Sequence, residues 1–304
     1  MSKWTVNNIP DLTGQVMIVT GANSGLGYET SKALAQKRAT VILACRNLEK
    51  GEAAQKAILR AVPEAALRLM KLDLSSLAAI GAFVDAFKQE FQALNVLINN
   101  AGVMALPRRQ TADGFEMQFG TNHLGHFALT GLLLELLQAT PSSRVVTVSS
   151  GLHQRGRLNF DDLHGEKGYG RWQAYSNSKL ANLYFAYELQ RRLSKTGSAT
   201  ISVAAHPGYS ATNLQSGSTK FFIEKWFLFW SNKLVAQSAA MGALPQLVAA
   251  VSPDVEGGDY FGPDGFNEMR GYPKKVRSSS LSYDKEIAQK LWQVSEDLTD
   301  IRYL

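Results

Sequence analysis

The feature that most constrains the fold of this chain is a regular alternation of short apolar segments and longer segments of helical periodicity. Strands are predicted at 16–20, 40–44, 67–72, 95–99, 144–148, 200–205 and 259–261, and helices at 26–37, 49–61, 77–91, 115–138, 174–193, 237–250 and 284–298. Strands that alternate with helices of this length favour parallel pairing through right-handed crossovers. The sequence therefore predicts one α/β domain over residues 1–304, a doubly wound parallel sheet of about seven strands with helices on both faces.

Composition and charge exclude several classes of protein. Apolar residues form 45% of the 304 residues and charged residues 19%, which is ordinary for a globular chain with a large core. The single cysteine, Cys45, rules out an internal disulfide and fits a cytoplasmic protein; it is expected to be a small buried residue. No signal peptide is expected at 1–15, and no apolar run is long enough to span a membrane.

Two further absences are predicted from the positions of basic residues and histidines. The net charge is +6, but the densest basic cluster, 274–277, has no interleaved aromatic stripe, so a nucleic-acid partner is not expected. His123 and His126 are three residues apart without other ligands nearby in the sequence. They are interpreted as core or loop histidines, and no metal site is expected.

A glycine-rich turn directly follows the first predicted strand. Residues 21–27 read Gly-Ala-Asn-Ser-Gly-Leu-Gly and lead into the helical pattern at 26–37. Strand, glycine turn and helix in this order are the context of a dinucleotide-binding fingerprint. Glycines allow a tight turn and close approach to a pyrophosphate, and the N–H groups at the helix start attract its charge. The spacing G-x-x-x-G-x-G differs from the commonest G-x-G-x-x-G.

Tyr175 and Lys179 are four residues apart in the predicted helix 174–193. Residues at this spacing share a helix face, so the hydroxyl and the ammonium group are expected to lie side by side. A nearby cation favours the phenolate, which predicts a Tyr175 pKa below the usual ~10 and a role in proton transfer. An exposed tyrosine beside an exposed lysine is the alternative, and the dinucleotide fingerprint upstream argues against it.

These motifs together resemble the short-chain dehydrogenase/reductase family, and most closely its retinol-dehydrogenase-like branch, from about residue 13 to the C-terminus. The resemblance implies a Rossmann fold whose cofactor-binding half is 13–150 and whose catalytic half is 151–304, with a substrate lid at about 213–236. It implies hydride transfer between a nicotinamide and a carbonyl or alcohol. The catalytic residues that it implies are Asn122, Ser150, Tyr175 and Lys179.

The resemblance assigns a role to each of these four residues. Tyr175 exchanges a proton with the substrate oxygen, and Lys179 lowers its pKa and binds the nicotinamide ribose. Ser150, the second serine after the strand 144–148, orients the substrate oxygen, with Ser149 as the alternative. Asn122 holds a water that links Lys179 to solvent.

The cofactor is predicted to be NADP(H) in preference to NAD(H). Arg46 ends the second strand, where an NAD site usually has a carboxylate, and a guanidinium there suits a 2′-phosphate. Asp73 is implied to bind the adenine; the alternative is a helix cap. The cofactor-binding residues implied by the resemblance are Gly21, Asn23, Ser24, Gly25, Leu26, Gly27, Arg46, Asp73, Leu74, Asn99, Ala101, Gly102, Tyr175, Lys179, Pro207, Gly208 and Thr212.

The segment 213–234 is rich in phenylalanine and tryptophan, at a position where the family has a variable lid. These aromatics are predicted to wall an apolar pocket for a lipophilic aldehyde, ketone or alcohol such as a retinoid. Peripheral membrane contact through 219–233 and plain core packing are left open, as is a homodimer. Two other functions are also kept: a light-dependent enzyme resembling protochlorophyllide reductase, and a non-catalytic cofactor-binding scaffold, which has no use for a proton relay.

Overall fold

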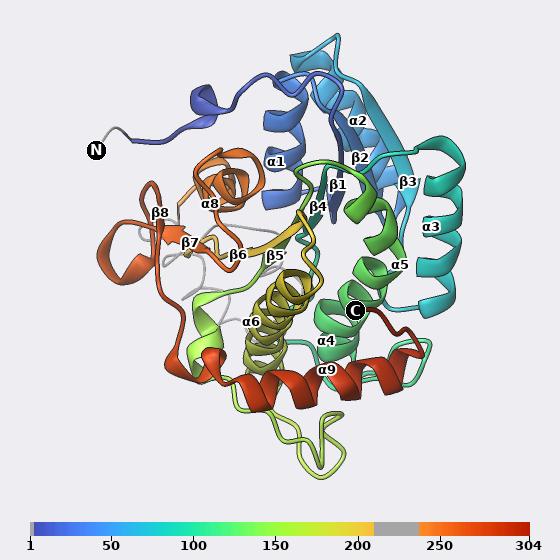
Figure 1. Ribbon diagram of the computed structural model, residues 1–304, viewed down its shortest axis with the longest axis vertical. Coiled ribbons are helices and arrows are strands. Elements are labelled where there is room, and N and C mark those ends of the chain that lie inside the picture. Colours follow the sequence, from blue (N-terminus) through green and yellow to red (C-terminus); the bar gives the residue numbers. More distant parts are fainter. Residues whose placement is uncertain (1–2, 210–236) are drawn as a thin grey trace, which may run out of the picture.

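Eight strands form one sheet at the centre of the protein (Figure 1). A computed structural model describes residues 3–209 and 237–304. The strands lie in the order β3-β2-β1-β4-β5-β6-β7-β8, and all are parallel except β8, which pairs antiparallel with β7. Their bounds are β1 (Val16–Thr20), β2 (Thr40–Cys45), β3 (Leu67–Lys71), β4 (Val96–Asn99), β5 (Arg144–Val148), β6 (Ile201–Ala205), β7 (Tyr260–Pro263) and β8 (Pro273–Lys275).

The seven predicted strands are confirmed, and the eighth was missed. β8 has only three residues, Pro-Lys-Lys, and lacks the apolar alternation from which a strand is predicted. Its place at the edge of the sheet tolerates both the proline and the exposed lysines.

Helices cover both faces of the sheet, as predicted (Figure 1). One face packs against α1 (Gly25–Gln36), α2 (Leu48–Ala61) and α8 (Ala239–Val251). The other packs against α3 (Leu77–Glu90), α5 (Gly125–Ala139) and α6 (Arg171–Lys195), and α9 (Lys285–Thr299) lies across α6. Each face has its own buried apolar cluster, so the structure is a three-layer α/β domain of the Rossmann type.

The order of the strands opens a crevice beside β1. This strand pairs with β2 on one side and β4 on the other, so the crossovers leave it in opposite directions. In open parallel sheets, ligands bind at such a reversal, outside the carboxyl ends of the strands. The glycine turn after Thr20 lies at this point.

The helix predicted at 115–138 is interrupted. The structure has a short α4 (Met117–Phe119), a π-helical turn at Gly120–Leu124 and then α5. Within that turn Gly125 donates its N–H to the carbonyl of Gly120, five residues earlier. Such widened turns occur often at functional sites, and this one contains Asn122.

Two features predicted from the sequence lie outside the part that the structure describes. They are Thr212 and the predicted lid at 213–236, which includes the proposed membrane contact at 219–233. Within residues 3–209 and 237–304, no helix has both the length and the apolar character needed to cross a membrane.

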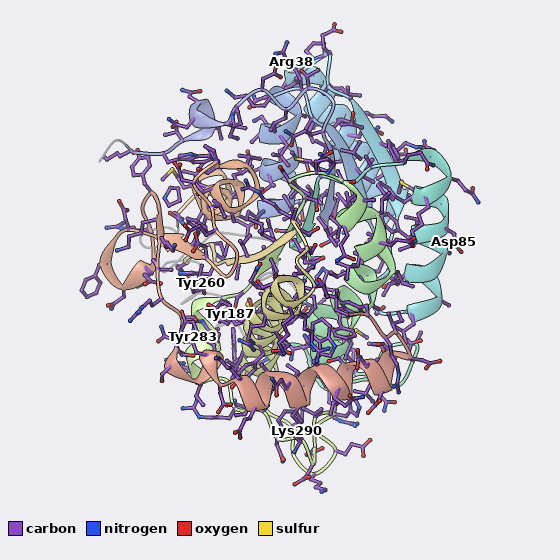
Figure 2. All side chains as sticks on the ribbon, viewed as in Figure 1. Arg38, Asp85, Tyr187, Tyr260, Tyr283 and Lys290 are labelled. Carbon is purple, nitrogen blue, oxygen red and sulfur yellow. The ribbon has the colours of Figure 1, made fainter. Side chains whose placement is uncertain are left out.

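Aromatic side chains join α9 and the C-terminal segments to the rest of the protein. Trp292 is buried, with its ring 5.1 Å from that of Phe127 and 4.8 Å from that of Tyr303. The ring of Tyr187 on α6 stacks on that of Tyr283, with 5.0 Å between the ring centres. Figure 2 labels both residues, together with Tyr260. These ring contacts therefore fix α9 and the segments on either side of it to the domain.

Replacement of Trp292 by alanine tests this packing. Removing a fully buried indole leaves a cavity between α5, α6 and α9, and we expect the free energy of unfolding to fall by ~3–5 kcal/mol. Urea denaturation followed by circular dichroism measures the loss. Gln293→Ala, at the neighbouring exposed position, is the control and is expected to cost at most ~0.5 kcal/mol. Equal stability of the two variants would contradict this account.

Candidate active site

Two adjoining cavities lie at the carboxyl edge of the sheet. The first, of about 300 Å³, follows the glycine turn and the ends of β2, β3 and β4. The second, of about 330 Å³, follows the ends of β5 and β6. Leu26, Asn100 and Gly102 line both, so the cavities form one continuous crevice. Its length crosses the point where the order of the strands reverses.

Most of the predicted cofactor-binding residues line this crevice. Those in the first cavity are Gly21, Asn23, Ser24, Gly25, Leu26, Gly27, Arg46, Asp73, Leu74, Ala101 and Gly102. Those in the second are Tyr175, Lys179, Pro207 and Gly208, together with Ser150. The exceptions are Asn99 and Thr212, of which the latter lies outside the described residues.

The glycine turn packs too closely for any side chain at its end. A Cβ on Gly27 would lie 2.4 Å from the carbonyl oxygen of Gly21 and 2.7 Å from Nδ2 of Asn100. Gly21 itself has a positive φ of 68°, which favours glycine. The turn therefore presents bare backbone to the first cavity, as a diphosphate site requires.

Asn100, and not Asn99, faces the crevice. The Asn99 side chain is buried and its Nδ2 donates to Oγ1 of Thr130 at 3.0 Å. The Asn100 side chain donates instead to the carbonyl of Thr20, at 2.7 Å. The Asn99 side chain therefore points away from the crevice that Asn100 lines, because successive side chains at the end of β4 point to opposite sides.

Two cations flank the outer end of the first cavity. Arg46 and Lys50 both line it and both are exposed. Asn47 lies between them and caps α2, its Oδ1 accepting the N–H of Lys50 at 2.8 Å. Lys50 was not predicted as a residue of this site, because the prediction rested on the end of the second strand alone. The first turn of α2 places Lys50 at the same cavity as Arg46.

Asp73 lines the first cavity, and it does not cap α3. The cap is Ser76, whose hydroxyl accepts the N–H of Ala79 at 3.2 Å. Asp73 is held in place by Ser75, whose N–H and hydroxyl both bind Oδ1, at 3.0 and 2.6 Å. Its carboxylate is therefore fixed at the cavity wall.

Tyr175 and Lys179 are both buried, with 6% and 4% of their surfaces exposed. The Lys179 ammonium donates to the carbonyl of Val148 at 3.1 Å and lies 5.8 Å from the centre of the Tyr175 ring. Burial raises the pKa of Tyr175 to about 12, against a hydrogen bond from Ser150 that lowers it. Burial also lowers the pKa of Lys179 to about 8. The predicted lowering of the Tyr175 pKa is therefore wrong for the protein alone, because desolvation by burial is the largest influence on this group.

The structure distinguishes the two serines after β5. The hydroxyl of Ser149 donates to the carbonyl of Lys179 at 2.8 Å, deep beside α6. Ser150 interacts with the Tyr175 hydroxyl and accepts the N–H of Leu152 at 3.2 Å. Ser150 is therefore the serine placed to contact a substrate oxygen that also meets Tyr175.

Asn122 is fixed by its side chain beside Lys179. Its Oδ1 accepts the N–H of Val103 at 2.8 Å, and its Nδ2 donates to the carbonyl of Val103 and to Ser178 Oγ, each at 2.9 Å. A Cβ on Gly102 would lie 3.2 Å from Asn122 Oδ1 and 3.5 Å from the Lys179 ammonium. Because both amide hydrogens are used, the groups of Asn122 that can hold a water are its two oxygen acceptors, Oδ1 and the main-chain carbonyl, each of which has two lone pairs.

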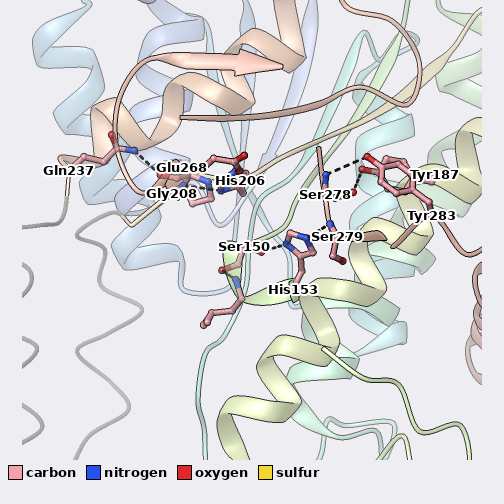
Figure 3. Close-up of polar contacts among 12 residues, drawn as sticks. Ser150, His153, Tyr187, His206, Gly208, Gln237, Glu268, Ser278, Ser279 and Tyr283 are labelled. Atoms are coloured by element: carbon pink, nitrogen blue, oxygen red, sulfur yellow. Dashed lines mark hydrogen bonds and ion pairs between the residues drawn. The ribbon is translucent and has the colours of Figure 1, made fainter. Parts of the chain in front are cut away.

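The wall of the second cavity that follows β7 was not predicted from the sequence. Asn267, Glu268 and Met269 line it. Glu268 accepts a hydrogen bond from Nε2 of His206 at 2.9 Å, which lowers its pKa (Figure 3). Residues 267–269 contain no recognisable sequence motif. Their position after the strand predicted at 259–261 was the one feature of the sequence that could have indicated a site. Among the described residues, no cluster of His, Cys, Asp and Glu could hold a metal ion.

Comparisons with known proteins agree with the fold and the motifs. The sequence profile of the short chain dehydrogenase family matches residues 15–221. Human retinol dehydrogenase 11 is 43% identical over 98% of this chain and 90% of its own, and human retinol dehydrogenase 12 is 41% identical over 96% and 88%. The chain therefore belongs to the short-chain dehydrogenase family, whose members are oxidoreductases, and it is retinol-dehydrogenase-like.

Solved structures show the same architecture. An uncharacterized protein from Mycobacterium paratuberculosis superposes with a TM-score of 0.83 and 40% identity over the whole of both chains. A short chain dehydrogenase from Shigella flexneri, in complex with NADP, superposes with a TM-score of 0.64 over 82% of this chain and 97% of its own. At 21% identity the second likeness shows the fold alone.

Cys45 provides a test of the packing under the glycine turn. It is fully buried, as predicted, and burial raises the pKa of its thiol to about 11. We expect the native protein to react with Ellman's reagent at least ~100-fold more slowly than an unfolded sample in guanidinium, because the thiolate is the reactive form. As the one cysteine of the chain, it makes the absorbance change unambiguous. Rapid reaction without unfolding would contradict the packing.

Proposed function

We propose that this protein is an NADP(H)-dependent oxidoreductase that transfers a hydride between a nicotinamide and a lipophilic carbonyl or alcohol. One observation carries the proposal: Ser150, Tyr175 and Lys179 line the second cavity where it joins the cavity of the glycine turn. A dinucleotide along the crevice would reach from Arg46 to these residues. The glycine cradle, which a single Cβ would fill, fits its diphosphate.

The chain supplies proton transfer and orientation to this reaction. The bound cofactor supplies the hydride acceptor or donor. Tyr175 donates a proton to the carbonyl oxygen in reduction and accepts one from the alcohol in oxidation, and Ser150 orients that oxygen. Lys179 stabilises the phenolate when it forms, and Asn122 joins Lys179 to solvent. In the reductive direction the raised Tyr175 pKa keeps the phenol protonated and ready to donate.

NADP(H) is favoured over NAD(H) by the outer end of the first cavity. Arg46 and Lys50 lie there with the neutral Asn47 between them, so two cations are placed to bind a 2′-phosphate. Asp73 lies deeper along the same wall and is proposed to bind the adenine.

The substrate is proposed to be a lipophilic aldehyde, ketone or alcohol, with a retinoid as the model. Leu152, Trp172 and Met269 line the second cavity, and the curated relatives are named retinol dehydrogenases. Several other expectations stay predictions. They are the division into a cofactor-binding half and a catalytic half at residue 150, the substrate lid, the homodimer, and a cytoplasmic location with peripheral membrane contact. Added pigment and an absorbance spectrum would distinguish a light-dependent reductase, and turnover would exclude a scaffold.

Tyr175→Phe tests the proton donor. We expect the rate of NADPH oxidation with an aliphatic aldehyde to fall by ~10²–10⁴-fold, because the phenol hydrogen is lost. NADPH binding, followed by fluorescence, is expected to survive. Tyr184→Phe removes a hydroxyl from the same helix, away from both cavities, and is expected to stay active. Near-normal turnover by Tyr175→Phe would remove the assignment.

Arg46→Ala tests the choice of cofactor. Loss of a charged hydrogen bond to the 2′-phosphate is expected to raise the Kd of NADPH by ~10–100-fold and leave that of NADH within about twofold. Titration calorimetry with both nucleotides measures the ratio. Arg60→Ala, at the far end of α2, is the control. An equal loss for NADH and NADPH would show that Arg46 does not read the phosphate.

A further inference from the structure

His126 is a buried histidine to which the proposed reaction assigns no role. It lies in the first turn of α5, with 1% of its surface exposed. Its Nδ1 is 3.0 Å from the main-chain carbonyl oxygen of Asn122, and its Nε2 is 3.0 Å from the hydroxyl of Thr20. One side chain thus joins the end of β1 to the π-helical turn.

These two contacts determine where the ring carries its hydrogen. A carbonyl oxygen can only accept, so Nδ1 must donate to Asn122. In the neutral ring Nε2 then accepts, and the hydrogen comes from the hydroxyl of Thr20. That hydroxyl has a second candidate acceptor, the carbonyl of Ile98, at the longer distance of 3.3 Å.

The ring is uncharged at neutral pH. Burial lowers the pKa of His126 to about 4, and the nearby charge of Lys179 acts in the same direction. His123, the other ionisable group close to the ring, is itself kept neutral by burial, which lowers its pKa to about 3. The direction of both hydrogen bonds is therefore fixed over the working range of pH.

Thr20 is a rigid anchor for this ring. Its hydroxyl oxygen also accepts the N–H groups of Asn100 and Ala101, both at 2.9 Å. Both residues follow β4, so the anchor holds the ends of the two central strands. A continuous set of hydrogen bonds runs from these strand ends through the ring to the Asn122 carbonyl.

The Asn122 carbonyl needs such a partner. It lies in a π-helical turn, where the regular hydrogen-bond ladder of an α-helix is interrupted. The side chain of Asn122 is held by Val103 and Ser178, which fixes the residue but not the direction of its carbonyl. The ring N–H occupies one acceptor position of that oxygen, and a carbonyl oxygen has two.

We propose that His126 is a positioning residue that directs the Asn122 main-chain carbonyl toward the proton path from Lys179. The inference rests on the proposed function, since that path is part of it. His126 touches neither the substrate nor the cofactor in this role. It acts through Asn122. Because its ring is anchored on Thr20, the rate of proton exchange depends on how firmly the ends of β1 and β4 are held.

Three variants separate this role from packing. His126→Leu keeps the volume and removes both hydrogen bonds. His126→Asn can place an amide N–H near the position of Nδ1 and restore the bond to the carbonyl. His123→Leu is the matched control: His123 is equally buried in the adjoining turn, but its Nε2 bonds Ser295 on α9, at 2.9 Å.

The measurement is steady-state oxidation of a primary alcohol by NADP⁺ in H₂O and D₂O, with the Kd of NADPH and the melting temperature of each variant. We expect His126→Leu to lower kcat about tenfold or more and to raise the solvent isotope effect, with the Kd within about twofold. His126→Asn is expected to recover most of the loss, and His123→Leu to lose melting temperature but little kcat. Equal kcat in all three variants, or no rescue by asparagine at equal stability, would overturn the proposal.

A second readout does not depend on turnover. Long-range ¹⁵N–¹H correlation spectra of histidine-labelled protein, assigned with the His126→Asn variant, are expected to show His126 as the neutral Nδ1–H tautomer. A neutral Nε2–H form would overturn the inference even in a fully active enzyme. Because the spectrum is taken on the wild-type protein, it tests the inference even if His126→Leu does not fold. If the wild-type protein shows the expected tautomer but oxidises no alcohol and reduces no carbonyl, the proposed function fails and not the geometry.

Discussion

The hydroxyl group of Thr20 is the junction on which the arrangement at the carboxyl edge of the sheet depends. It accepts two backbone N–H groups from the segment after β4 and contacts His126 on α5. The glycine turn begins at the next residue and packs against Asn100, which the same contacts hold. The end of a strand, the glycine turn and the start of α5 are therefore placed by one buried polar group. Such fully satisfied networks are rigid, because each unpaired member would be costly in a low dielectric.

Desolvation, more than the attraction between Tyr175 and Lys179, sets the proton affinities of the site. Burial raises one pKa and lowers the other, so both groups move toward their neutral forms. Lys179 in the folded chain, with a pKa of about 8, binds fewer protons above that pH than an exposed lysine with its pKa near ~10.4. The free energy of unfolding therefore rises with pH between about 8 and ~10.4. Below about pH 8 Lys179 is charged while buried, and this lowers the stability of the fold. The chain retains a feature that weakens its fold, as functional sites often do.

The parts of the site that were predictable are those encoded in contiguous residues. The glycine turn and the Tyr175–Lys179 pair each depend on local spacing, and their positions follow from the alternation of strands and helices. The choice between Asn99 and Asn100 depends on the direction of a strand end, which spacing does not specify. The π-helical turn was unpredictable because 115–138 carries an unbroken apolar pattern. The roles of His126 and Glu268 depend on contacts between elements that are distant in the sequence. The resemblance to a family implied neither role.

The geometry around Ser150 and Tyr175 also depends on segments far along the chain from the motifs. His153 donates to the carbonyl of Ser150 at 2.7 Å and accepts the N–H of Ser279 at 3.0 Å, so a C-terminal loop holds the serine's backbone (Figure 3). Close by, Tyr187 on α6 bonds Ser278 at 2.7 Å. These contacts tie Ser150, which follows β5, and α6, which carries Tyr175, to the same segment. Ser150 and Tyr175 come from different elements and need a common support if their separation is to stay constant, and residues 278–279 provide it.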